Sequence, residues 1–231
     1  MPEGESVKSV AVIGGGASGI MASLFAARSG CRVVLFEKQN RLGRKISVSG
    51  NCNIANNGLD VSRYHGANTS VLHSIFARFG FSETVDFFSS IGLPFVEGKK
   101  GRLYPASLQA STVVRILEYE LAKAGVEVHL HRRVESVKFD GSAFRLVTGG
   151  KEEHIFDRVI LSAGSSAHPQ VGGSTWGYEL AESLGHHVID PFPAILPVNI
   201  PLKRLHRLEG VKWDCQVTVR EKGKVLAGSV D

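Results

Sequence analysis

The sequence has few cysteines and no long hydrophobic run. Its three cysteines, Cys31, Cys52 and Cys215, are widely spaced and form no CxxC pair. This pattern argues against a disulfide framework or a zinc site and favours a reducing, cytoplasmic location, so we expect no metal. The longest apolar stretches have only strand length, so we expect no membrane span. Residues 1–8 carry Glu3 and Glu5 and do not have the pattern of a secretory signal.

What the sequence does contain is a glycine-rich turn inside a predicted βαβ unit. An apolar strand is expected over residues 9–13, a helix over 17–29 that ends at Gly30, and a second strand over 32–36. Between the first strand and the helix lies Gly14-Gly15-Gly16-Ala17-Ser18-Gly19. This order of elements is typical of a dinucleotide-binding unit, whereas the glycine pattern alone would be weak evidence.

Each glycine of the pattern has an expected role. Gly14 allows the tight turn, Gly16 lets the backbone approach a pyrophosphate, and Gly19 lets helix and strand pack closely. The pyrophosphate would lie at the positive end of the helix, next to unpaired N–H groups. Glu37, which follows Gly19 by 18 positions at the end of the second strand, is expected to accept a hydrogen bond from a ribose hydroxyl.

The charge is dispersed. Lys and Arg number 27 and Asp and Glu 22, a net charge of +5, with the densest basic groups at 41–45, 99–102 and 203–207. The first group follows the glycine turn closely and is expected to serve the phosphates of a cofactor. We interpret the other two as solvated turns, so a nucleic-acid partner is not expected.

The remaining pattern predicts a mixed α/β chain. A parallel strand is expected at 158–161 and a small antiparallel group near 134–156. The expected helices lie at 69–79, 82–91, 111–124 (capped by Ser111) and 177–184, and the expected hairpins pair 95–97 with 102–104 and 215–220 with 225–230.

Prolines between 191 and 201 suggest a domain boundary. We expect a nucleotide-binding domain over 1–195 and, over 196–231, the beginning of a truncated β-rich inserted domain. Two strands alone cannot bury a face. We therefore expect a truncated chain with little turnover.

Two classes of nucleotide-binding enzyme fit poorly. A short-chain dehydrogenase needs Tyr-x-x-x-Lys, and Tyr119 and Lys123 supply it. The glycine spacing is wrong for that class, however, and both residues fit the exposed side of a helix. A flavin disulfide reductase needs CxxxxC, but Cys52 has Asn57 in the partner position.

Four segments, in order, resemble the HI0933-like or aminoacetone-oxidase-like family of bacterial NAD(P)/FAD-dependent oxidoreductases. They cover residues 37–53, 101–107, 160–169 and 185–197. The resemblance implies a glutathione-reductase-type FAD-binding fold: a Rossmann-like α/β domain with a parallel sheet and a small antiparallel appendage, followed by the start of a β-rich second domain. One departure is that Gly50-Asn51-Cys52-Asn53 lacks a Gly-Arg pair of the family pattern, which puts in doubt a role for that arginine near the flavin.

The resemblance also implies where FAD would bind. Arg44 and Lys45 would lie over its phosphate or flavin side, Val134 would read adenine, and the returning strand would end against the cofactor. The expected cofactor-binding residues are Gly14, Gly16, Ala17, Ser18, Gly19, Glu37, Lys38, Arg44, Lys45, Ser49, Gly50, Asn51, Cys52, Val134, Ala163 and Gly164.

The expected function is therefore hydride transfer between a small organic substrate and FAD, with NAD(P)H as a candidate transient donor. Two alternatives stay open: a non-catalytic FAD-binding fragment, and a flavoprotein acting on RNA. The sequence identifies no catalytic residue, substrate or oligomeric state.

Overall fold

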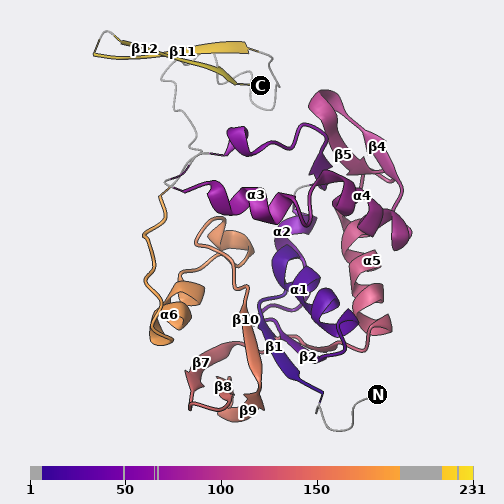
Figure 1. Ribbon diagram of the computed structural model, residues 1–231, viewed down its shortest axis with the longest axis vertical. Helices are drawn as coiled ribbons and strands as arrows, with labels where there is room; N and C mark the ends of the chain where they lie inside the picture. Colours follow the sequence, from indigo (N-terminus) through magenta and orange to yellow (C-terminus); the bar gives the residue numbers. More distant parts are fainter. Residues whose placement is uncertain are drawn as a thin grey trace. The chain divides into compact units, whose positions relative to one another are not determined.

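The computed structural model (Figure 1) describes residues 7–48, 50–64, 66, 68–192, 215–222 and 224–230. The chain divides into two compact units, Met1–Asp190 and Pro191–Asp231. In the second unit, β11 (Cys215–Glu221) and β12 (Lys224–Val230) form the predicted antiparallel hairpin. The boundary predicted between residues 195 and 196 falls outside the described residues and stays a prediction.

The first unit is built on a parallel sheet of four strands in the order β10-β1-β2-β6. These are β10 (Arg158–Leu161), β1 (Ser9–Ile13), β2 (Arg32–Phe36) and β6 (Glu127–His129). Helix α1 (Ala17–Arg28) connects β1 to β2, so the predicted βαβ unit is confirmed. The chain moves from β1 to β2 and β6, then returns to the other side of β1 as β10. Such a reversal creates the crevice where open α/β sheets bind ligands.

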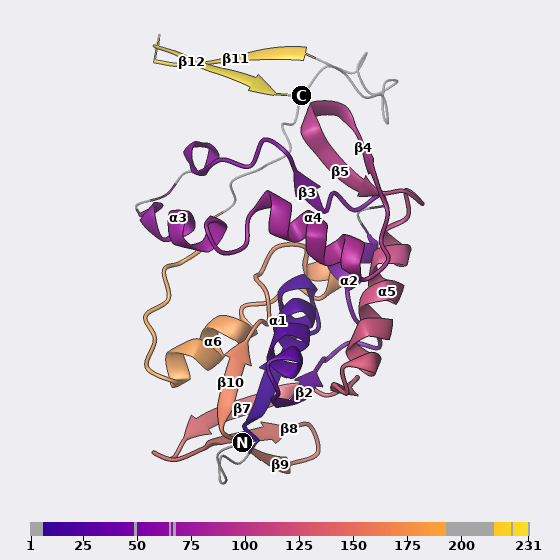
Figure 2. The same ribbon diagram turned by 45° about the vertical axis from the view of Figure 1, so that its right-hand side comes forward.

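The central strands β1 and β2 are buried on both faces, which explains why Val10–Ile13 and Val33–Phe36 are continuously apolar. Alternate residues point to opposite sides. Val10, Val12 and Leu35 belong to a core that includes α1 and α5 (Ala110–Lys123), whereas Ala11 and Phe36 belong to a second core. That second core includes the antiparallel sheet β7 (Val134–Phe139), β8 (Phe144–Thr148) and β9 (Glu152–Phe156). In Figure 2, α1 and α5 lie on one side of strands β1 and β2, and the antiparallel sheet of β7 to β9 lies on the other.

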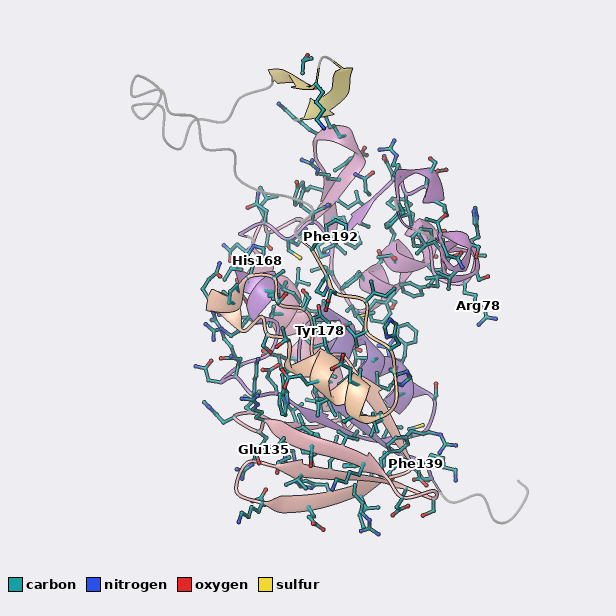
Figure 3. All side chains as sticks on the ribbon, turned by 90° about the vertical axis from the view of Figure 1, so that its left-hand side faces the viewer. Arg78, Glu135, Phe139, His168, Tyr178 and Phe192 are labelled. Atoms are coloured by element: carbon teal, nitrogen blue, oxygen red, sulfur yellow. The ribbon has the colours of Figure 1, made fainter. Side chains whose placement is uncertain are left out.

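Helix α6 (Trp176–Ser183) follows β10 and packs on β7. In Figure 3, α6 carries Tyr178 and lies beside the antiparallel sheet, with Glu135 and Phe139 near the two ends of β7. This contact brings the beginning of α6 close to the beginning of β7, although the two lie 42 positions apart in the sequence.

The other elements surround this frame. The predicted helices at 69–79 and 82–91 are α3 (Ser70–Phe76) and α4 (Phe81–Ser90), and the predicted hairpin consists of β4 (Phe95–Glu97) and β5 (Arg102–Pro105). The long segment after β2 contains the short helix α2 (Arg44–Ser47), the two-residue strand β3 (Ala55–Asn56) and the 3-10 turn η1 (Val61–Arg63). Two further 3-10 turns are η2 (Lys99–Gly101) and η3 (Pro169–Val171).

The predicted cap of α5 is wrong. The helix begins at Ala110, one residue before Ser111, and Gln109 occupies the N-cap position. The Ala110 amide donates to the carbonyl of Gly50 at 2.7 Å. A distant backbone group therefore satisfies the helix terminus in place of a local side chain.

Asp157 connects the turn before β10 to the first residue of β1. Its Oδ2 accepts from the Ser9 amide and the Ser9 hydroxyl, both at 2.7 Å. These hydrogen bonds hold the pKa of the Asp157 carboxyl below its usual range. A depressed carboxyl pKa stabilises the fold above the pKa of the unfolded chain, and the stabilisation is lost as the pH falls through the folded value.

Asp157→Asn is therefore expected to lower the Tm at pH 7, and the difference from the unaltered chain should shrink as the pH is lowered through the acidic range. Thermal unfolding followed by circular dichroism at several pH values measures both effects. Asp86→Asn, at an exposed position of α4, is the control. Equal Tm values for Asp157→Asn and the unaltered chain at pH 7 would contradict the prediction.

Candidate functional site

A cavity of about 370 Å³ opens at the carboxyl ends of β1, β2 and β10. This is the edge of the sheet at which the strand order reverses, and the volume lies in the range of small-molecule and cofactor sites. Its walls come from the glycine loop after β1, the loop after β2, the beginning of β7 and the segment between β10 and α6.

Two glycines of the loop are required by the fold itself. Gly14 has φ +108°, and a Cβ there would lie 2.5 Å from the carbonyl oxygen of Ser162 on the neighbouring chain segment. A Cβ on Gly19 would lie 1.8 Å from the carbonyl oxygen of Gly14. A side chain at either position would collide with backbone, so these glycines permit the tight turn and the close helix packing that the sequence predicts.

Gly16 is different. A Cβ built on it would meet no described atom within 4 Å, and its backbone lines the cavity in an ordinary extended conformation. The fold around it therefore does not require a glycine. The empty space in front of Gly16 is the cradle that a bound group would fill.

The amino terminus of α1 opens into this cavity. Gly16 occupies the N-cap position, and in the described structure no side chain caps the helix and no acidic residue stands in its first turn. Ala17 and Ser18 line the cavity. The positive end of a 12-residue helix and its unpaired amides thus suit an anionic group such as a pyrophosphate.

Glu37 has a role that the sequence does not reveal. Its side chain is buried, its Oε2 accepts from the Gly15 amide at 2.7 Å, and its Oε1 accepts from the Gln39 amide at 2.7 Å. The carboxylate therefore fixes the glycine loop and the loop after β2 to each other. A carboxylate has about four lone-pair sites, so each oxygen can still accept one further hydrogen bond, for example from a ribose hydroxyl.

The cavity is strongly basic. Within its described lining Glu37 is the only carboxylate, and the cationic side chains are Lys38, Arg41, Arg44, Lys45, Arg132 and Arg133. Lys38 Nζ donates to Ser174 Oγ at 3.0 Å, and Arg44 Nη1 donates to Gln39 Oε1 at 2.6 Å. Burial lowers the pKa of the Lys38 ammonium, Glu37 opposes this shift, and Arg133 and Lys45 add to it. Such a concentration of positive charge suits phosphate groups.

The structure brings most of the expected cofactor-binding residues together. Those that line the cavity are Gly14, Gly16, Ala17, Ser18, Glu37, Lys38, Arg44, Lys45, Val134, Ala163 and Gly164. Gly19 lies directly behind the loop, inside α1. Their contact with a cofactor remains a prediction.

The segment of residues 49–52, which follows α2, is expected at the cofactor, but its described residues do not line the cavity. The described lining does not include Gly50, Asn51 or Cys52, and Ser49 falls outside the described residues. Cys52 packs against the core formed with α1 and α5, and this burial raises the pKa of its thiol. The predicted contact of this segment with a flavin ring is untested.

Sequence reasoning missed one wall of the cavity. Arg132, Arg133 and Trp176 line it, and Trp176 Nε1 donates to the carbonyl oxygen of Val134 at 2.7 Å. The adjacency of two arginines to Val134 in the sequence was an available signal for part of this wall. The position of Trp176 depends on a contact between α6 and β7 that no local pattern shows.

A glycine loop, an acidic residue at the end of β2 and a basic cavity at the switch point together define a Rossmann-type nucleotide-binding domain. The family model described as "HI0933-like protein Rossmann domain" matches residues 8–230. The chain belongs to this family, as its sequence motifs indicate.

Two curated proteins illustrate the relationship. The chain is 36% identical over 222 residues to the 3-dehydro-bile acid delta(4,6)-reductase of Clostridium scindens, covering 94% of this chain and 54% of that protein. It is 30% identical over 220 residues to the ribosomal RNA dihydrouridine synthase of Escherichia coli, and this match covers 93% of this chain and 54% of that protein. The chain thus spans about half the length of the curated relatives that it matches.

A solved structure shows the same fold. The 3-ketosteroid-delta4-(5alpha)-dehydrogenase of Rhodococcus jostii superposes with a TM-score of 0.53 at 16% identity, over 71% of this chain and 48% of that one. At this identity the similarity concerns the fold alone. Among the described residues, the helices are too short or too polar to cross a membrane.

Proposed function

We propose that this chain is the FAD-binding part of a flavin-dependent oxidoreductase. The observation that carries the proposal is the basic cavity in which the glycine loop, the Glu37 carboxylate and the amino terminus of α1 meet. The open space at Gly16 and the excess of cationic side chains fit a pyrophosphate. FAD supplies reversible hydride chemistry when bound at such a site.

The residues of this chain would bind and orient the ADP half of FAD. The amides of Gly16, Ala17 and Ser18 would hold the pyrophosphate, with Arg44 and Lys45 neutralising its charge. Glu37 would accept from the ribose. These roles keep the cofactor in place, and they leave the catalytic acid or base unassigned.

The relatives suggest a reaction class. One is named as a delta(4,6)-reductase of a bile acid, and the other as a synthase of dihydrouridine, which is a uridine with two added hydrogens. Both names describe the addition of hydrogen to a ring double bond. We therefore propose reduction of a carbon–carbon double bond in a small organic substrate, with NAD(P)H as the proposed electron donor.

RNA is the second candidate substrate. It is favoured by the 30% identity to a ribosomal RNA dihydrouridine synthase. The sequence argued against a nucleic-acid partner, and that argument is untested. Retention of ribosomal RNA that falls steeply with added salt would support this second candidate.

FAD binding can be tested on the chain as it stands. The purified chain should be yellow, and mass spectrometry of the released ligand should identify FAD. FMN lacks the ADP group that the glycine loop would recognise, so it should not be retained. Recovery of NAD(P) without any flavin would overturn the proposal. Turnover is proposed for the whole protein; a chain that retains FAD without reductase activity would match the alternative of a non-catalytic FAD-binding fragment.

A further inference from the structure

One wall of the cavity lies outside the glycine loop and contains neither Arg44 nor Lys45, the two cations proposed to neutralise the pyrophosphate. Trp176 is the first residue of α6, and its indole lines the cavity beside Val134, the first residue of β7. The guanidinium carbon of Arg133 lies 4.4 Å from the centre of the indole ring. We call these two stacked side chains the Trp176–Arg133 pair.

The environment of the pair leaves an aromatic surface available. Phe36, the other aromatic residue in the described lining, is only 1% exposed, whereas Trp176 is half-buried and Arg133 is exposed. The hydrogen bond from the indole to Val134 fixes the ring orientation. It also uses one lone pair of the Val134 carbonyl, so this backbone group is less free to recognise a ligand by itself.

We propose that the Trp176–Arg133 pair is the adenine-binding wall of the cavity. The inference rests on the proposed function, because it places the adenine of FAD in this cavity. A flat purine would pack against the stacked indole and guanidinium, and recognition would depend mainly on stacking. A base stacked on an aromatic side chain contributes enough that its loss weakens binding about tenfold to a hundredfold.

The chain offers an internal reporter for this wall. It contains two tryptophans, so Trp213→Phe leaves Trp176 as the only source of indole fluorescence. In this background, AMP should change the Trp176 emission saturably. AMP contains no flavin, so the change cannot arise from energy transfer to isoalloxazine.

Substitutions then measure the contribution of each partner. Arg133→Gln should weaken FAD and AMP binding by about tenfold, and Trp176→Leu by up to about a hundredfold. Trp176→Phe loses the hydrogen bond to Val134 but keeps an aromatic ring. Its affinity for FAD and AMP should therefore fall less than that of Trp176→Leu. Arg115→Gln, an exposed arginine of α5 that is not among the described cavity-lining residues, should bind like the unaltered chain.

The outcomes separate this inference from the proposed function. If FAD binds with unchanged affinity to Arg133→Gln and to a folded Trp176→Leu, and AMP leaves the Trp176 emission unchanged, the adenine wall is refuted while FAD binding stands. If the unaltered chain binds neither FAD nor ADP, the proposed function fails and the inference fails with it. Because Arg133 is exposed, its substitution tests the inference even if Trp176→Leu does not fold.

Discussion

Gly16→Val is expected to leave the fold intact and to remove FAD binding. A Cβ at this position meets no described atom within 4 Å, so the valine side chain has room in the free protein. It would fill the space in front of the helix amino terminus and keep a pyrophosphate away from the amides. Loss of two or more charge-assisted hydrogen bonds at about 1.5–3 kcal/mol each corresponds to at least about a hundredfold weaker binding.

Gly19→Val is the matched comparison, because it makes the same chemical change three positions later. Its Cβ would stand 1.8 Å from the carbonyl oxygen of Gly14, so α1 and the loop could not keep their present packing. This variant should show a much lower Tm or fail to fold. Circular dichroism and a flavin fluorescence titration distinguish the two variants. A Gly16→Val protein that binds FAD normally would place the nucleotide elsewhere.

The strands and the glycine loop that form the base of this site can be predicted from the sequence, because the patterns that specify them are local. After their first residues, Ser9 and Arg32, strands β1 and β2 are buried and apolar. The run of glycines between them is unusual for any other kind of turn. The antiparallel hairpins of β7 to β9 are bounded by turn residues such as Asp140 and Gly141, whose preferences are also local. The strands predicted at 9–13 and 32–36 coincide with β1 and β2, and the antiparallel group predicted near 134–156 corresponds to β7, β8 and β9.

The remaining parts of the site depend on distant contacts. The Val134 carbonyl accepts from the Trp176 indole across 42 positions of the sequence. The amide of Ala110 donates to the carbonyl of Gly50, and β3, β4 and β5 lie between these two residues in the sequence. Neither contact leaves a periodic pattern in the sequence. The same limit applies to Cys52, since a cysteine in a loop cannot be assigned to the core or to a cavity until the packing is known.

Glu37 shows how a correct residue can be given an incomplete role. From the sequence, it is a ribose acceptor whose loss should affect affinity alone. In the structure, its carboxylate also accepts from two backbone amides, those of Gly15 and Gln39, at 2.7 Å each. Removing the side chain would leave the buried Gly15 amide and the partly buried Gln39 amide without their acceptor, and unsatisfied buried donors are costly.

Glu37→Ala is therefore expected to lower both stability and FAD affinity. The free energy of unfolding should fall by about 2–4 kcal/mol, since two charge-assisted hydrogen bonds are lost and partly replaced by water. The affinity for FAD should fall about tenfold to a hundredfold, because the ribose acceptor is lost and the glycine loop is no longer fixed. Urea unfolding measures the loss of stability. Flavin titration measures the loss of affinity, and it is done without urea at a temperature well below the Tm of the variant.

Two further variants separate the contributions. Glu37→Gln retains one acceptor oxygen but directs an amide N–H at a backbone N–H, so its stability should lie between those of Glu37→Ala and the unaltered chain. Glu118→Ala removes a carboxylate from an exposed position of α5 and should change neither quantity. If Glu37→Ala loses FAD affinity at unchanged stability, the two backbone hydrogen bonds contribute nothing to the fold and Glu37 acts only through the ligand. If it loses stability at unchanged affinity, the carboxylate holds the loop without touching the ribose. Only a loss of both quantities fits a residue that fixes the glycine loop and binds the nucleotide with the same two oxygens.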